Sequence, residues 1–559
     1  MVTKSGAVCQ QVVRDAGVYY KSLIIVFAPV ALAAVVFTTL GTGTDIRCAY
    51  VVMVMATFWV TDVLPLPVTA LLPVVAFPLL GVLTAGQVAP NYLKDTNFLF
   101  IGGLMMAVAV EESNLHTRLA CRVLMLFGSN PRWLMLGFQL TTAFLSMWIS
   151  NTATTAMMLP IAIAVIHQIE EARERDQSTS AISESRSDDN SAVQSGKFNK
   201  ALLLSISYSA NIGGLGTLTG SPSNIVLTGQ LAELYPEQSE LSYVTWMAYS
   251  LPMCIIALII AWAWLQLIFI GVRAQKSDPE VVRIIERKYK SLGKMNFHEG
   301  MAGFMFGILV CLWLFRDPQV FPGWGALWPP KYVSDGTSAM IIALLMFALP
   351  RSPPDWLCTS SRRVGTDATS HESMMTWDLM QRRFDWGTVM LLGGGYAMAA
   401  GVKESGLSLL ISAQLEALTA FPPWVFLLIA VTIVTFLTEF SSNVATASIV
   451  IPIMATLAQS YGTNPLYYML PVTTACSFAF MLPAATPPNA IVFSSQMIKA
   501  IDMAIAGLGM NFLCIGVATI NALTYGYWLF DFGTLPAWAN VTTVAVPVTP
   551  PSFAGTALP

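Results

Sequence analysis

Long apolar runs, each near the length that crosses a lipid bilayer, recur from one end of the chain to the other. A transmembrane helix needs about 20 predominantly apolar residues, and on this measure the pattern predicts eleven membrane spans. We place them at about 22–40, 47–64, 66–84, 97–112, 201–235, 244–272, 299–316, 335–350, 386–402, 465–497 and 505–529. The hydrophobic pattern therefore predicts an all-α polytopic membrane protein.

Two further apolar segments are interrupted by polar residues at their centres. The segment 133–167 holds Ser-Asn-Thr at 150–152, and the segment 423–460 holds Ser-Asn-Val at 442–444. Such residues are poor in helix interiors and good in caps and turns. Each segment is therefore expected to be a re-entrant hairpin that turns at membrane depth, where only protein or a water-filled cavity can satisfy non-helical backbone.

The two hairpins belong to an internal repeat with a constant offset of 292 residues, which pairs Asn151 with Asn443. A second matched pair consists of breaks within the spans 201–235 and 465–497, where Asn224 pairs with Asn489 at an offset of 265. The offset shortens because the first copy carries a polar insert. Interrupted segments at matching places in two halves are typical of a transporter's binding site.

Lysine and arginine orient these spans. They concentrate in the N-terminal segment and at 114–132, 168–200, 273–297 and 351–383. Eleven crossings put all five regions on one side, which the positive-inside rule identifies as the cytoplasm. The C-terminus is then extracellular, where Asn540 begins a glycosylation sequence. The hairpins enter from opposite faces, so the repeats are inverted.

This organisation divides the chain into two halves. The first half, 1–272, contains six spans, the hairpin 133–167 and a polar cytoplasmic loop at 168–200. A basic linker at 273–298, expected as a solvated helix, leads to the second half at 299–530. The latter contains the hairpin 423–460 and the broken span 465–497. Residues 531–559 form an extracellular tail. We also expect an amphipathic surface helix at 114–130.

The composition agrees with a membrane protein and narrows the chemistry. The chain is 55% hydrophobic and 11% charged, with a net charge of −3, and its mean hydropathy is +0.63. The membrane spans argue against a nucleic-acid partner. Eight cysteines without a CxxC pair and four scattered histidines give no metal-ligand spacing. An intramembrane enzyme would need a paired nucleophile and base, which the motifs lack, and matched helix breaks argue against a purely structural role.

The paired tips suit an anion together with cations. A helix that begins at membrane depth points free N–H groups and its positive dipole end at the cavity. Two such ends from opposite faces can hold a dianion, while amide, hydroxyl and broken-helix carbonyl oxygens suit alkali cations. No Arg or Lys lies in the motifs, so co-bound cations are the expected charge partners.

Several acidic residues also lie in or near the spans. Intramembrane carboxylates are functional by default, and the candidates are Asp62, Glu111, Glu112, Glu404 and Glu439. Glu112 and Glu404 occupy matched positions in the two repeats. For that pair we favour structural roles at helix ends.

The tips resemble the twin signatures of the divalent anion/sodium symporters, the sodium-coupled di- and tricarboxylate and sulfate carriers. The stretch 477–483 through Asn489 and Val492 is similar to the second signature of that family, and the motifs are nearest its animal branch. The resemblance implies sodium-coupled symport of succinate or citrate across the plasma membrane, without a cofactor. It also implies a homodimer in which each transport domain moves against a scaffold as an elevator. Sodium-independent exchange and sulfate transport are the alternatives on the same fold.

The resemblance also implies individual roles. A first sodium site would use Ser146, Ser150, Asn151 and Gly220. A second would use Thr438, Ser441, Asn443 and Ala485. Substrate carboxylates would be held by Asn151, Thr152, Ser221, Asn443, Val444, Thr486 and Pro487. Val444 departs from the Ser-Asn-Thr pattern, which removes one hydroxyl and makes the site asymmetric.

Overall fold

The computed structural model describes residues 2–128, 130–180, 188–271, 279–329, 331–352, 372–415 and 421–539, and every regular element in these ranges is a helix. The prediction of an all-α fold is confirmed. Asn540 and the tail beyond it lie outside the described residues. Within the described part, eight helices are long and apolar enough to cross a membrane.

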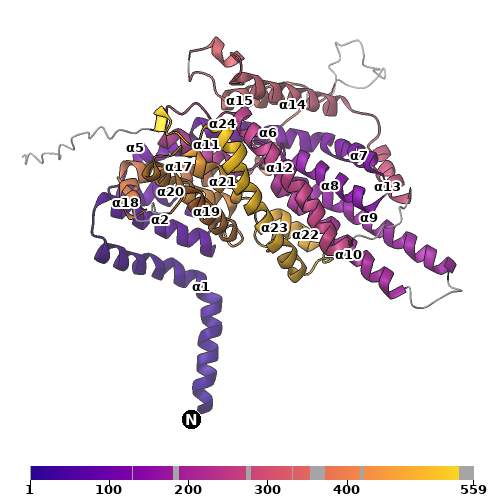
Figure 1. Cartoon of the computed structure of the whole chain (residues 1–559), viewed down its shortest axis with the longest axis horizontal. Helices are drawn as coiled ribbons and strands as arrows, with labels where there is room; N and C mark the ends of the chain where they lie inside the picture. Colours follow the sequence, from indigo (N-terminus) through magenta and orange to yellow (C-terminus); the bar gives the residue numbers. More distant parts are fainter. Residues whose placement is uncertain are drawn as a thin grey trace, which may run out of the picture.

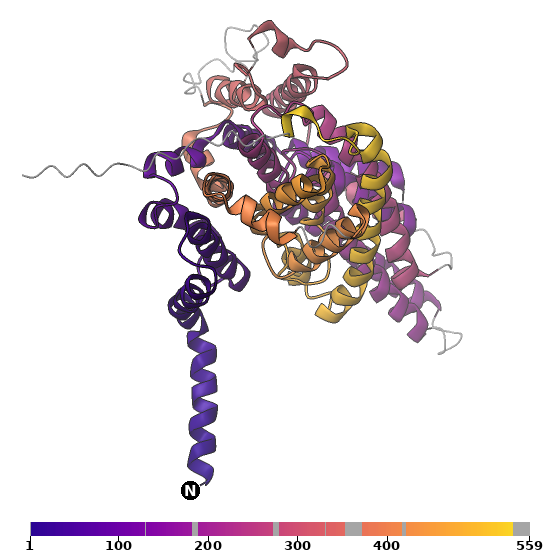
Figure 2. The same cartoon turned by 60° about the vertical axis from the view of Figure 1, so that its left-hand side comes forward.

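The chain begins with elements that precede the first repeat. They are α1 (Val2–Thr39), α2 (Thr44–Thr61), α3 (Leu66–Thr69), α4 (Leu72–Leu79), α5 (Ala85–Val88) and the 3₁₀ turn η1 (Ala89–Leu93). Helix α1 extends away from the bundle in both views (Figures 1 and 2). The span expected at 66–84 is two short helices, because Pro65, Pro67 and Pro73 lack the N–H groups that a continuous helix needs.

The two repeats run in the same order of elements. The first comprises α6 (Asp95–Ser113), α7 (Leu115–Phe127), α8 (Pro131–Ser146), α9 (Asn151–Ser180), α10 (Asp188–Gly213), α11 (Pro222–Leu234) and α12 (Tyr243–Leu265). The second comprises α17 (Trp386–Glu404), α18 (Leu407–Leu415), α19 (Pro423–Leu437), α20 (Asn443–Tyr461), α21 (Leu466–Ala475), α22 (Pro487–Ser494) and α23 (Ala500–Asn521). Both hairpins and both broken helices occur where the sequence predicts them.

The remaining helices connect and cover the repeats. They are α13 (Pro279–Ser291), α14 (Phe297–Arg316), α15 (Asp335–Ala348), α16 (Trp377–Arg383) and the short α24 (Tyr527–Phe530). Helix α15 packs along α6. A Cβ on Gly102 of α6 would lie only 2.6 Å from the Ala339 Cβ of α15, so glycine is needed for this close approach.

One expectation is wrong: most of the polar segment 168–200 is helix rather than loop. Helix α9 continues to Ser180 and α10 begins at Asp188, so that only 181–187 lie outside the described residues. The first part of the insert, residues 168–177, is rich in Glu, Arg and Gln, which favour helix, and the hairpin helix therefore continues beyond its apolar part. The surface helix expected at 114–130 is present as α7, whereas its counterpart α18 is not anticipated by the sequence analysis.

A buried arginine fixes the linker between the halves to the first repeat. The Arg118 guanidinium of α7 donates to the Glu299 carboxylate at 2.7 and 3.2 Å, and to the carbonyl oxygens of Gly293 and Leu292 at 2.9 and 3.2 Å. Arg118 is 8% exposed and Glu299 4% exposed. The backbone just after the linker helix α13 is therefore held by Arg118, whose charge is paired with Glu299.

Replacing Arg118 with Ala should destabilise the protein by about 3–5 kcal/mol, because Glu299 would remain buried without its partner. Thermal unfolding of purified protein in detergent measures the loss as a lower melting temperature. Lys331→Ala is the control, because the Lys331–Glu237 pair is exposed and exposed pairs contribute about 0–1 kcal/mol. Equal shifts in the two variants would contradict the role of Arg118.

Candidate functional site

Both hairpin tips and both helix breaks line one cavity of about 860 Å³. Ser150, Asn151, Thr152, Gly220 and Ser221 approach it from the first repeat. From the second repeat it is lined by Ser441, Asn443, Val444, Ala485, Thr486 and Pro487. The structure thus brings every predicted substrate residue to one place, although these residues come from four segments far apart in the sequence.

The remaining two predicted residues lie directly behind the tips. The Ser146 hydroxyl donates to the Asn151 Oδ1 atom at 2.7 Å and to the Ala210 carbonyl at 2.8 Å. In the second repeat, the Thr438 hydroxyl donates to the Asn443 Oδ1 atom at 2.9 Å and to the Cys476 carbonyl at 2.7 Å. A hydroxyl, an amide oxygen and a backbone carbonyl oxygen therefore converge at each tip, in a set that suits an alkali cation.

These bonds also decide which end of each asparagine amide faces a ligand. Because Oδ1 of Asn151 and of Asn443 accepts from the neighbouring hydroxyl, the NH₂ group of each amide is left as a donor. Both residues begin their helices, α9 and α20, and both line the cavity. Each tip thus presents an amide donor and the free N–H groups of a helix start, which suits a carboxylate.

A second pair of asparagines, Asn224 and Asn489, holds the loops that break the two spans. Asn224 Nδ2 donates to the carbonyls of Gly214 and Thr217 at 3.0 and 2.8 Å. Asn489 Nδ2 donates to Ala479 and Leu482, both at 2.9 Å. The partners match at the offset of 265, so the two loops have one design. The sequence analysis used these asparagines as markers of the repeat and assigned them no role.

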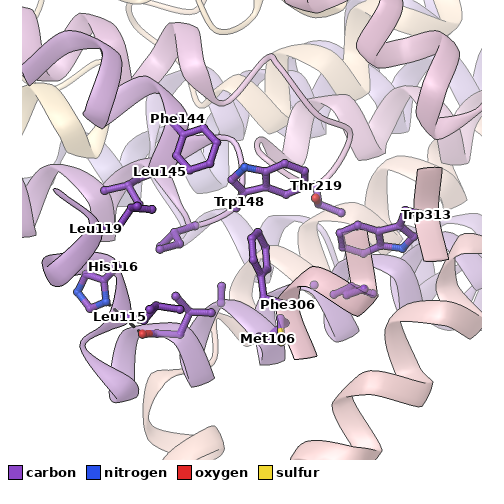
Figure 3. A pocket seen from close by; sticks show the side chains of 15 residues that line it. Met106, Leu115, His116, Leu119, Phe144, Leu145, Trp148, Thr219, Phe306 and Trp313 are labelled. Atoms are coloured by element: carbon purple, nitrogen blue, oxygen red, sulfur yellow. Dashed lines mark hydrogen bonds between the residues drawn. The ribbon is translucent and has the colours of Figure 1, made fainter. Parts of the chain in front are cut away.

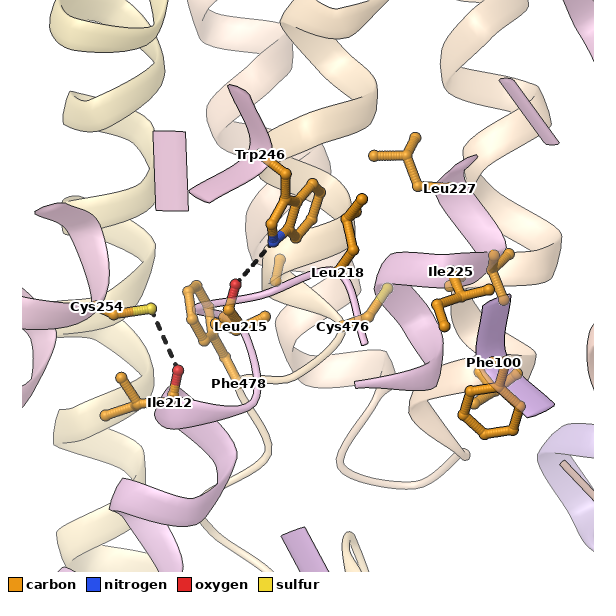
Figure 4. Packing of buried hydrophobic residues seen from close by; sticks show 14 of the residues in the cluster. Phe100, Ile212, Leu215, Leu218, Ile225, Leu227, Trp246, Cys254, Cys476 and Phe478 are labelled. Carbon is orange, nitrogen blue, oxygen red and sulfur yellow. Dashed lines mark hydrogen bonds between the residues drawn. The ribbon is translucent and has the colours of Figure 1, made fainter. Parts of the chain in front are cut away.

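The first loop is also held from behind by α12. Trp246 Nε1 donates to the Leu215 carbonyl at 3.0 Å, and Cys254 Sγ donates to the Ile212 carbonyl at 3.2 Å (Figure 4). Leu215 and Ile212 themselves pack in the apolar cluster with Phe478 of the second repeat. The non-helical backbone at 214–220 is thereby satisfied by protein, as membrane depth requires.

One difference between the repeats is a buried hydrogen bond. Ser207 of α10 donates to Asn489 Oδ1, whereas the buried Asn224 Oδ1 has no partner in the described part of the chain. The second-repeat counterpart of Ser207 is Val472, which has no hydroxyl to offer. The Nδ2 atoms of Asn224 and Asn489 thus make equivalent hydrogen bonds, whereas only Asn489 also has a partner for its Oδ1 atom among the described residues.

A buried carboxylate anchors the second loop alone. Glu439 follows Thr438 and is 2% exposed. It accepts the N–H groups of 480, 481 and 482 at 2.8, 3.0 and 3.1 Å, and the Asn511 amide at 2.7 Å. The first-repeat counterpart is Met147, whose carbonyl accepts from Thr217 instead. Glu439 thus places a negative charge next to the predicted second sodium site.

One of the two carboxylates expected to have structural roles at helix ends, Glu112, lies outside the site. Glu112 is 3.4 Å from both Arg351 and Arg383, in accord with a role at a helix end. Its neighbour Glu111 lines the cavity wall, together with Asp62, Arg383 and Asp385. Arg383 is the sole Lys or Arg among the residues that line the cavity. The described residues contain no cluster of three or more His, Cys, Asp and Glu side chains suited to a metal ion.

A smaller apolar pocket lies beside the first tip (Figure 3). It is bounded by the hairpin residue Trp148, by Met106 and His116 of the first repeat, and by Phe306 of α14. The rings of Trp148 and Phe306 meet edge to face, with centroids 5.2 Å apart. The first hairpin therefore contacts its surroundings here through an apolar surface.

Comparison with known proteins agrees with this geometry. The family model of the sodium:sulfate symporter transmembrane region matches residues 17–532. A sodium-dependent high-affinity dicarboxylate transporter 3 of Caenorhabditis elegans is 44% identical over 504 residues, covering 89% of this chain and 87% of the relative. The Na⁺/citrate cotransporter of Rattus norvegicus is 39% identical over 564 residues, covering 94% and 98%. The human Na⁺/dicarboxylate cotransporter 3 is 36% identical over 588 residues, covering 95% and 96%.

Solved structures share the fold at low sequence identity. Neisseria gonorrhoeae MtrF, described as illuminating a class of antimetabolite efflux pumps, aligns with a TM-score of 0.52 and 12% identity, covering 81% of this chain and 84% of its own. The Alcanivorax borkumensis YdaH transporter aligns with a TM-score of 0.50 and 12% identity, covering 79% and 87%. These similarities bear on the architecture alone.

Replacing Ser207 with Ala should destabilise the protein by about 1–3 kcal/mol, because Asn489 Oδ1 would be left buried without a donor. Thermal unfolding in detergent measures this effect. Ser205→Ala is the matched control, since Ser205 is also buried in α10 but donates only to the Leu202 carbonyl within its own helix. A Ser207→Ala variant no less stable than the control would contradict the anchoring role.

Proposed function

Because the chain belongs to the sodium:sulfate symporter family, we propose that it is a sodium-coupled symporter of di- and tricarboxylates such as succinate and citrate. It is a multi-pass membrane transporter, not an enzyme, and sodium is its coupling ion. The observation that carries the proposal is the meeting of two half-helix starts, α9 and α20, in one cavity that has no lysine or arginine at the tips.

The missing positive charge argues for bound sodium. A dicarboxylate that leaves bulk water for this cavity needs compensating charge, and the tips supply only amides, hydroxyls and backbone groups. In this proposal, one sodium ion is held by Ser146, Ser150, Asn151 and Gly220, and another by Thr438, Ser441, Asn443 and Ala485. Sodium and substrate then lower each other's desolvation cost, which couples their binding.

The substrate carboxylates lie between the tips in this proposal. Asn151, Thr152 and Ser221 bind from the first repeat. From the second repeat the ligands are Asn443, Val444, Thr486 and Pro487. Two carboxylates of one molecule can thus be met from opposite sides by helix starts with positive dipole ends. Because Val444 offers no side-chain donor, the second tip relies more on its backbone.

Transport proceeds by alternating access in the proposed mechanism. Asp62, Glu111, Arg383 and Asp385 lie at the predicted cytoplasmic ends of their segments and line the same cavity as the tips. We therefore assign this structure to a state open to the cytoplasm. The hairpins, with α10–α12 and α21–α23, would move as a transport domain against a scaffold in a homodimer, in the manner of an elevator.

The cellular placement belongs to the same proposal. The positive-inside distribution puts the N-terminus in the cytoplasm and the C-terminus outside the cell. The protein would then reside in the plasma membrane, and Asn540 would be available for glycosylation on the extracellular face. The eleven crossings expected from the sequence put the two hairpins on opposite faces.

Replacing sodium with choline should reduce uptake of labelled succinate and citrate into proteoliposomes to the level of empty vesicles. The reason is that the carboxylates would enter the cavity without their charge partners. An excess of unlabelled sulfate in a parallel series tests the sulfate alternative by competition. Undiminished uptake in choline would contradict sodium coupling and favour exchange.

Asn151→Ala should abolish sodium-dependent uptake while surface expression stays normal, because the change removes a carboxylate donor and a cation ligand together. Uptake per surface-labelled transporter in transfected cells measures this. Asn91→Ala is a matched control, since Asn91 is buried but donates to Gln87 and Val88 outside the cavity. Near-normal uptake in Asn151→Ala would refute the assigned role.

A further inference from the structure

The cavity is closed on the predicted extracellular side by a set of contacts at the end of α11. Lys94, just before α6, forms an ion pair with Glu233, and Lys403 of α17 donates to the Glu233 carbonyl at 2.7 Å. Beside them, a Cβ on Gly229 would lie only 2.1 Å from the Tyr396 ring of α17. Charge and close packing thus hold α11 against α6 and α17.

The matching stripe of positions on α6 lines the cavity. At the offset of 292, Gly395, Tyr396, Ala399 and Lys403 of α17 correspond to Gly103, Leu104, Ala107 and Glu111 of α6. All four residues of α6 line the open cavity. In contrast, α17 packs closely against α11 and α20. The stripe on α17 is therefore packed against other helices, whereas the stripe on α6 lines the cavity.

The counterpart of the end of α11 lies on the cytoplasmic side. At the offset of 265, Glu233 and Leu234 correspond to Ile498 and Lys499, which follow α22. Suppose that α6 packs against α22 in the way that α17 packs against α11. Glu111 of α6 then occupies the position that corresponds to Lys403 of α17. It would meet the chain at 498–499. A carboxylate there needs a donor, and the Lys499 ammonium supplies one.

We propose that Glu111 and Lys499 form an ion pair that closes the cavity on the cytoplasmic side when the binding site faces outward. This inference rests on the alternating access of the proposed function. The charges are reversed relative to the outer contact. There α17 contributes Lys403, whereas α6 contributes Glu111 to the proposed inner contact. The remaining outer pair, Lys94 and Glu233, has the apolar counterpart Trp386 and Ile498.

Glu111 and Lys499 do not form an ion pair in the present structure. Among the described residues, Glu111 has no ion-pair partner, and the Lys499 side chain is exposed. Arg383 lines the same cavity wall as Glu111 but lies 3.4 Å from Glu112. Glu111 is therefore a partly buried carboxylate of the cavity wall that forms no ion pair among the described residues.

Charge exchange tests the pair in sodium-driven succinate uptake by proteoliposomes. Glu111→Lys and Lys499→Glu should each slow uptake by about tenfold, and the double variant should recover most of the wild-type rate, because contacting charges are coupled. Glu112→Lys combined with Lys499→Glu is the matched control. Since Glu112 already pairs with Arg351 and Arg383, this combination should give no recovery.

Disulfide cross-linking tests the same pair independently of its charge. Glu111→Cys with Lys499→Cys should cross-link under oxidation, block uptake and recover on reduction, since a disulfide requires Cα atoms within about 7 Å. Lys94→Cys with Glu233→Cys reports the outer contact. Peptide mass spectrometry separates the engineered links from those of native cysteines, and formation of either link should prevent the other.

The outcomes separate the inference from the function on which it rests. No sodium-dependent uptake by the wild-type protein would overturn the proposed function itself. Normal wild-type uptake, with no recovery in the Glu111→Lys and Lys499→Glu double variant and no inner cross-link, would overturn the ion pair alone. An outer cross-link in that same experiment would show that the cysteine chemistry worked.

Discussion

The fold depends on satisfying non-helical backbone at membrane depth. Each hairpin and each broken span exposes peptide groups that lipid cannot solvate, and the protein meets this need mainly with asparagine. Asn224 and Asn489 bind the carbonyls of the broken spans, while Asn151 and Asn443 are held by a hydroxyl behind each tip. Of these four asparagines, Asn151 and Asn443 also line the cavity.

Using neutral groups for this purpose has a direct consequence for function. Amides and hydroxyls can face a carboxylate through their donors and a cation through their oxygens, so one site can bind both. A fixed arginine would neutralise the anion in every state and remove the need for sodium. The single buried charge near the tips, Glu439, is committed to four N–H donors of the second loop and of Asn511.

The duplication is close in backbone and inexact in chemistry. Ser207 supplies a donor to Asn489, yet its counterpart Val472 supplies none to Asn224. A carboxylate anchors the second loop where the first uses a threonine hydroxyl and a tryptophan. These differences give the two loops different hydrogen-bond anchors.

The sequence by itself determined the two tips, the two breaks and most of the spans, because apolar length and polar interruption are local properties. The span expected at 66–84 is an exception, since its prolines divide it into two short helices. At 168–200 the polar composition suggested a loop, but most of the segment is helix because many of its residues favour helix. Only the tertiary structure revealed that Asn224 and Asn489 bind loop carbonyls, and that Glu111 and Arg383 line the same cavity as the tips. The sequence does not tell which of the matched stripes on α6 and α17 faces the cavity. That depends on how the neighbouring helices pack, and here α17 is packed against α11 and α20 while α6 lines the cavity.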